Sequence, residues 1–144
     1  MRTLLLLPVL IMHSFLAFAL PSARTPQFMV MLSAGTPVQV TLNEALDLDV
    51  VMTGHAVDFT VRNNVVVNGK VLIAAGAWAA GIVRKVKVGC DGNCGTITIT
   101  VEEARAVDGS VVRLRSMPHT MNAEVANVGV NLRALVLDDA WVNA

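Results

Sequence analysis

The chain contains no tyrosine, and phenylalanine and tryptophan bring its aromatic share to only 4% of 144 residues. Charged side chains make up 15%, and 11 basic residues are balanced by 11 acidic ones. Proteins that hold nucleic acid usually carry a basic excess and stack bases on aromatic rings, so this composition argues against a nucleic-acid partner. What the sequence does have is apolar material, 54% of the residues, which is enough to fill the core of one domain.

Residues 1–19 have the order of a secretory signal peptide. Arg2 supplies a positive charge, Leu4–Leu20 is almost wholly apolar, and Ala17-Phe18-Ala19 fits the small-x-small site of a signal peptidase. We therefore expect residues 1–19 to be removed, residues 20–31 to form an exposed segment, and the mature protein to be periplasmic or secreted without a stable membrane span. An uncleaved anchor is the alternative, although the apolar run is at the short limit for a span.

Two cysteines, Cys90 and Cys94, bracket the turn-forming residues Asp91-Gly92-Asn93. Export would place them in an oxidising compartment, where a disulfide across the mouth of a hairpin loop is the simplest interpretation. Two alternatives stay open: a free thiol pair, or half of a metal site whose other ligands would have to be His55 and His119. We expect the disulfide, with no metal and no cofactor.

Between Ser33 and Ser116, apolar and polar residues alternate with a period of two, which is typical of antiparallel strands with one buried face. The clearest runs are Val38–Leu42, Val57–Val61, Ile97–Val101 and Val112–Leu114. The turn dipeptides Asn68-Gly69 and Asp108-Gly109 predict hairpins. The pattern predicts an all-β domain over residues 32–116, a small antiparallel barrel or sandwich of six to seven strands. Its interior should be filled by valine, isoleucine, leucine and Trp78.

Charged residues break this alternation at two places. Arg84 falls in phase with the apolar residues Trp78 and Ile82, and Glu102-Glu103 end the clean run that begins at Ile97. We expect a β-bulge at each place, because one extra residue restores the alternation and curves the sheet. A buried Arg84 paired with Glu102 or Glu103 is the alternative.

The tail, residues 117–144, follows a different period. Its apolar residues recur at steps of four and three, which is typical of one helix face: Met121, Val125, Val128, Leu132 and Leu135. This spacing predicts a C-terminal helix. A last strand over Leu135-Val136-Leu137 is the alternative, because glycine and asparagine in the tail weaken a helix.

Residues suited to catalysis are scattered along the chain. Ser33, Ser110 and Ser116 lie in no Gly-x-Ser-x-Gly motif, and His55 and His119 occupy turns where a solvated histidine is expected. The acidic pairs lack the ligand count of a calcium loop, and no phosphate-binding glycine loop occurs. We therefore predict that the protein is not an enzyme.

A basic strand face is a candidate binding surface. Lys85 and Lys87 point opposite to apolar neighbours in one predicted strand, and Arg113 and Arg115 do so in another. If the two strands are adjacent, the four cations share one face that could hold an anionic ligand. The alternative is a solubilising face that protects a sheet edge from aggregation.

The order of glycine turns and strands from Leu32 to Ser116 resembles a known group of proteins. Its pieces are Ala34-Gly35-Thr36-Pro37-Val38, Val57–Val61 after Gly54, Leu72–Ala77, Ala80–Val83, and Val107-Asp108-Gly109 before Val112. This order resembles small exported bacterial β-domains of unknown function. It is distantly similar to the C-terminal barrel of the scaffold protein of type IV secretion and conjugation machines. The resemblance implies the barrel fold rather than a role in secretion.

These features together predict a non-catalytic exported β-domain with a structural or protein-interaction role in the cell envelope. Its partner would be an envelope protein or a second copy of the chain. The alternative is a barrel that binds an anionic ligand or polysaccharide through the basic strand face.

Overall fold

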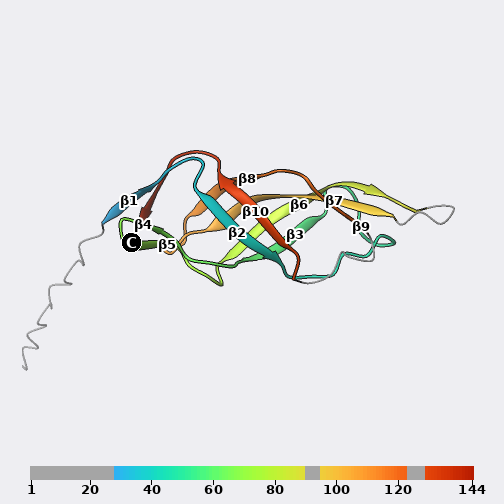
Figure 1. The fold of residues 1–144 in the computed structure, drawn as a ribbon, viewed down its shortest axis with the longest axis horizontal. Helices are drawn as coiled ribbons and strands as arrows, with labels where there is room; N and C mark the ends of the chain where they lie inside the picture. Colours follow the sequence, from blue (N-terminus) through green and yellow to red (C-terminus); the bar gives the residue numbers. More distant parts are fainter. Residues whose placement is uncertain (1–27, 90–94, 123–128) are drawn as a thin grey trace, which may run out of the picture.

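The computed structural model describes residues 28–89, 95–122 and 129–144, and these residues form strands, turns and loops without a helix. The predicted all-β fold is therefore confirmed (Figure 1). In chain order the strands are β1 (Met29–Leu32), β2 (Pro37–Leu42), β3 (Ala56–Val61), β4 (Val65–Val67), β5 (Lys70–Ile73), β6 (Trp78–Lys87), β7 (Thr96–Arg105), β8 (Val111–Ser116), β9 (His119–Asn122), β10 (Asn131–Val136) and β11 (Ala140–Asn143).

Six strands close into a small antiparallel barrel. Their order is β6-β3-β2-β10-β8-β7, and β7 pairs back onto β6, so the sheet has no end there. The remaining strand, β9, pairs with the opposite edge of β7 from β6. Of the two architectures that the sequence left open, the structure is the barrel.

The core is filled by the inward-facing residues of the barrel strands together with residues of β1 and β5. Buried and exposed residues alternate along β8 and β10, as expected for strands with one face in the core and the other in solvent. The largest fully buried side chains are Phe59, Leu32, Leu42, Leu72, Ile73, Ile97 and Ile99. In the described residues the core is thus aliphatic around one buried phenylalanine, Phe59.

Trp78 does not belong to this core, contrary to the sequence-based expectation. In β6 the inward positions are Ala79, Gly81 and Val83, and Trp78 is half-buried on the outside. Its Nε1 donates a hydrogen bond of 2.8 Å to Oδ1 of Asp58 on the neighbouring strand β3. The indole N–H finds a polar partner on the outer wall, which an aliphatic interior would not offer.

The two predicted β-bulges are both present between β6 and β7. The pairing passes from Ala80–Glu103 to Gly81–Val101, so Glu102 is an extra residue. It then passes from Val83–Ile99 to Lys85–Thr98, so Arg84 is the second extra residue. The bulges turn both side chains outward, where Arg84 and Glu102 form an exposed ion pair instead of a buried one.

The predicted hairpins are also confirmed. Asn68 and Gly69 link β4 to β5 with φ values of 51° and 75°, the two positive angles of a type I′ turn. Asp108 and Gly109 lie in the turn that links β7 to β8, and Gly109 has a φ of 85°.

The predicted C-terminal helix is wrong for the described part of the tail, which forms β9, β10 and β11. Strand β10 pairs with β2 on one side and β8 on the other, so the barrel extends beyond Ser116. Its inward residues are Leu132, Ala134 and Val136, with a period of two. Burial between two strands decides the conformation here, and the helical spacing of the apolar residues does not.

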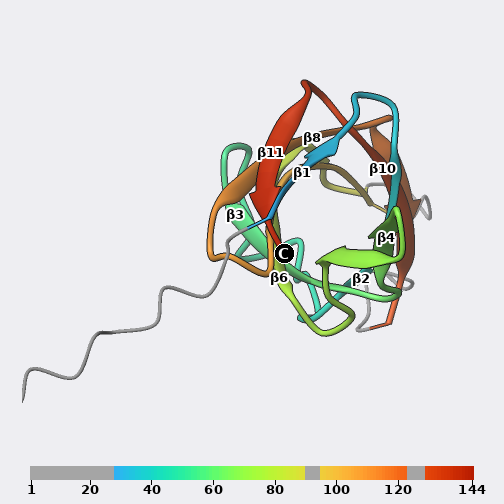
Figure 2. The same ribbon diagram turned by 90° about the vertical axis from the view of Figure 1, so that its left-hand side faces the viewer.

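Two small sheets cover one end of the barrel. β1 pairs with β11, and β4 pairs with β5. Figure 2 looks onto this end, where β1, β11 and β4 lie around the rim. Leu32 of β1 is fully buried, whereas Met29 and Met31 are exposed, so the expected exposed segment 20–31 ends in a paired strand. Cys90, Cys94 and the expected signal peptide lie outside the described residues.

Candidate interaction surface

The four cations of the predicted basic face do not form one cluster. β6, which carries Lys85 and Lys87, and β8, which carries Arg113 and Arg115, are separated by β7. The lysines lie opposite Thr98 and Thr96 near one end of β7, whereas Arg113 lies opposite Glu103 near its other end. The condition of adjacent strands is thus not met, although all four side chains are exposed.

Arginines from other strands join Arg115 instead. Arg115 lies opposite Leu135 of β10, so Arg133, two residues earlier on the same face, is its diagonal neighbour. On the far side of β10, Arg133 lies opposite Gln39 of β2. The backbone of Gln39 accepts a 2.8 Å hydrogen bond from the N–H of Arg62. An arginine row, defined as Arg113, Arg115, Arg133 and Arg62, therefore crosses the outer wall.

The barrel wall opens beside this row. β8 is paired with β10 up to Ser116–Ala134, and with β7 up to Arg113–Glu103. After Met117 and Pro118 the chain continues as β9, which pairs with β7 and not with β10. Proline has no N–H for a ladder, which suits the point where the chain changes neighbours. We call the gap between β9 and the first half of β10 the seam.

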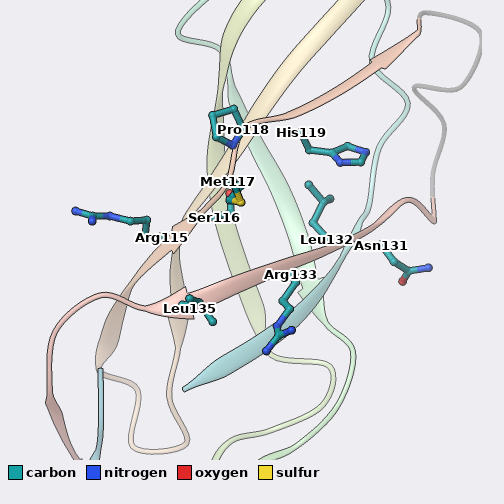
Figure 3. Close-up of a pocket in the computed structure, with 9 residues that line it drawn as sticks. All are labelled: Arg115, Ser116, Met117, Pro118, His119, Asn131, Leu132, Arg133 and Leu135. Atoms are coloured by element: carbon teal, nitrogen blue, oxygen red, sulfur yellow. The ribbon is translucent and has the colours of Figure 1, made fainter. Parts of the chain in front are cut away.

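A groove of about 750 Å³ lies along the seam. Its lining is Arg115, Ser116, Met117, Pro118, His119, Asn131, Leu132, Arg133 and Leu135. Leu132 is a buried residue of the inner face and points between the two strands, while Met117 is 85% exposed (Figure 3). The side chains of Arg115 and Arg133 extend in different directions in Figure 3, one to the left and one downward. The groove thus combines an apolar floor with separate cationic positions.

The backbone of β10 has an open edge at the seam. Val130 accepts a hydrogen bond from Leu42, and Val136 donates one to Thr36, so the even-numbered residues face β2. Leu137 donates to Arg113, so the odd-numbered residues face the β8 side. The pairing with β8 ends at the Ala134–Ser116 pair, so in the described part of the chain the N–H of Arg133 and both backbone groups of Asn131 face the seam without a strand partner.

Ser116 secures the closed end of the seam. Its Oγ accepts a 2.7 Å hydrogen bond from the buried N–H of Val101, next to the bulge at Glu102. A second hollow, of about 440 Å³, lies on this side of β8 and is lined in part by Arg84, Glu102 and Arg113. Within the described ranges, no buried side-chain nitrogen or oxygen lacks a hydrogen-bond partner.

The groups considered for catalysis are not gathered at one site. His55 is exposed in the turn before β3, as expected, and His119 is exposed at the rim of the groove. Asp47 accepts a hydrogen bond from the N–H of Asp49, and Asp139 accepts one from Ala34, so these acids hold turns and loops. Residues 28–89, 95–122 and 129–144 contain no group of three metal-ligating side chains.

Among the carboxyl groups of the described residues, Asp108 is the one whose pKa is shifted. Partial desolvation raises its pKa. Hydrogen bonds from the Ser110 hydroxyl and from the backbone N–H groups of Asn143, Ser110 and Asp108 itself lower the pKa by more than desolvation raises it. The net pKa lies below the ordinary value. Oδ2 accepts the Asn143 N–H at 2.9 Å, so this carboxylate ties the β7–β8 turn to β11 and has a structural role.

Sequence reasoning missed the seam, and with it Arg62, Arg133 and the apolar floor. The local signal for the seam was Met117-Pro118 directly after an alternating strand, because a proline there indicates that the strand stops pairing with its neighbour.

Searches of protein-family models and of curated proteins found no match to this chain. In the described residues no helix is long and apolar enough to cross a membrane.

Proposed function

We propose that the protein is a non-catalytic exported β-barrel domain that acts by binding another protein in the cell envelope. The observation that carries this proposal is the groove at the seam, where apolar side chains and arginines lie together on the outer wall. An interface core of apolar residues with arginine around it is typical of protein-binding surfaces.

The barrel interior supports a binding role over a catalytic one. Aliphatic side chains occupy it, and the two buried polar residues of the described ranges, Thr100 and Ser116, both have hydrogen-bond partners. An active site needs several polar groups directed at one concave site. The histidines and carboxyls that could serve lie on separate turns and outer faces.

The arginine row favours a second candidate, which is the binding of an anionic ligand or polysaccharide. Arg113 and Arg115 belonged to the predicted basic face, and Arg133 and Arg62 extend it across β10. Such binding would need only charge, and it would weaken steeply with salt. An apolar floor would contribute nothing to it, so we rank it below a protein partner.

Photo-crosslinking in cells tests the proposal. A benzophenone amino acid would be placed at Leu135 in the groove, and at Val50 in the β2–β3 loop as the control. Both are exposed aliphatic residues, at 41% and 72%, and Val50 does not line the groove. We expect Leu135 to crosslink to one envelope protein, or to a second copy, in the periplasmic or secreted fraction, and Val50 to yield no such product.

Two results would overturn the proposed function. One is equal crosslinking patterns at Leu135 and Val50, which would mean that the groove has no preferred partner. The other is turnover of a substrate that is lost on replacing one histidine while the fold survives. The export itself is checked by mass spectrometry of the mature N-terminus, which we expect between Leu20 and Arg24.

A further inference from the structure

We propose that the seam binds an extended acidic peptide segment of the partner, which lies between β9 and β10 as an added strand. This inference rests on the proposed function and specifies the chemistry of the partner. It follows from three properties of the seam: an open backbone edge, a small apolar floor, and cations on the outer wall.

The backbone edge indicates a strand as the occupant. Asn131 directs its N–H and C=O groups into the seam, and Arg133 directs its N–H there. On the other side, β9 is the last strand of its sheet, so its edge opposite β7 also lacks a strand partner in the described ranges. Open strand edges are templates for an added strand, and an extended peptide satisfies their hydrogen bonds.

The side chains around the seam indicate the sequence of that strand. In an added strand, alternate side chains would point inward over Leu132 and outward toward Arg115 and Arg133. The inward positions would take small apolar residues, because Leu132 is buried in the inner face. The outward positions would take Asp or Glu, because both arginines are exposed and have no ion pair to a described acidic residue.

The same geometry argues against one small anion as the occupant. The guanidinium groups of Arg115 and Arg133 point in different directions, so they would reach different positions of an elongated ligand (Figure 3). An extended segment with two acidic side chains could reach both positions.

A designed peptide tests the inference on the full exported chain. The probe is a fluorescein-labelled six-residue peptide in which glutamate and valine alternate. The control peptide has lysine in place of each glutamate. Fluorescence anisotropy should show binding of the acidic peptide only. N-methylation of alternate peptide backbone nitrogens should weaken binding about tenfold in either register, because one set of N–H groups faces β10 and the other set faces β9.

Variants of the protein locate the binding site. The double variant Arg115→Glu with Arg133→Glu should weaken binding of the acidic peptide about tenfold or more. The double variant Lys85→Glu with Lys87→Glu is the matched control, since it reverses two exposed cations on β6 that do not line the groove, and it should leave binding within about twofold. Circular dichroism and thermal unfolding would show that each variant is folded.

Amide hydrogen exchange of the complex distinguishes an added strand from surface attraction. Binding of the acidic peptide should slow exchange at the N–H groups of Asn131 and Arg133. Binding without this protection would overturn the strand, and equal affinity for a polyphosphate probe would favour the anionic-ligand candidate instead. Failure of the peptide to bind, with a specific crosslink still formed at Leu135, would refute the acidic strand and leave the proposed protein partner in place.

Discussion

Replacing Ser116 with alanine should destabilise the barrel by removing one acceptor at the closed end of the seam. The Oγ of Ser116 accepts the N–H of Val101 at 2.7 Å, and both residues are buried. β8 has already left its ladder with β7 at this point, since their pairing ends at Arg113–Glu103. No other acceptor from β8 therefore replaces the hydroxyl in the ladder.

The expected loss follows from the cost of a buried donor without a partner, which is about 1–3 kcal/mol. For a chain of this size, each kcal/mol lowers the melting temperature by about 2–4 °C. Urea unfolding followed by circular dichroism would measure the free energy of unfolding by linear extrapolation. Ser33→Ala is the matched control, because Ser33 is exposed in the turn between β1 and β2, where its backbone carbonyl accepts the hydrogen bonds of Thr36, and its effect should stay within about 0.5 kcal/mol.

The reasoning would be refuted if Ser116→Ala and Ser33→Ala unfolded at the same urea concentration as the original protein. That result would mean that the Val101 N–H finds another acceptor at no cost. The closed end of the seam would then not depend on the serine hydroxyl.

Three further predictions concern the fold. Gly81→Ala should lower the free energy of unfolding by more than about 3 kcal/mol, because the added Cβ would lie 1.9 Å from a backbone carbonyl oxygen of β7. Gly76→Ala has open space around the added Cβ but a φ of 84°, so it should cost only about 1–2 kcal/mol. Equal losses for the two variants in urea unfolding would contradict this. The lowered pKa of Asp108 stabilises the fold above its unfolded pKa, and this contribution is lost as pH falls through the folded pKa. Asp108→Asn should therefore be less stable at neutral pH and equal at low pH, and a pH-independent difference in melting temperature would refute the assignment. If Cys90 and Cys94 form the expected disulfide, the native exported protein should resist thiol labelling without reductant. Stoichiometric zinc in the purified protein would contradict the disulfide.

Local features of the barrel could be predicted from the sequence because their causes are local. Asn68-Gly69 favours positive φ angles wherever it occurs, and it forms the expected hairpin. Arg84 and Glu102 interrupt an alternating pattern, and a bulge is the general solution to such an interruption. These signals need no knowledge of which strands are neighbours.

The seam could not be predicted because it depends on pairings between distant segments. β10 lies between β2 and β8, and nothing near Leu132 or Arg133 in the sequence specifies those neighbours. The phase of Trp78 was missed for a related reason. Gly81, which the backbone of β7 approaches closely, shares the inward phase of β6 with Ala79 and Val83, so Trp78 lies outside. The basic face failed to assemble because its two strands flank β7 instead of one another.

Amide hydrogen exchange along β10 in the free protein tests the open seam most directly. Because Leu132 and Ala134 face β2, their N–H groups should exchange slowly. The N–H groups of Asn131 and Arg133 face the seam and should exchange much faster, so protection should alternate along one strand. Equal protection of Arg133 and Leu132 would mean that the seam is closed, and it would contradict the binding site built on it.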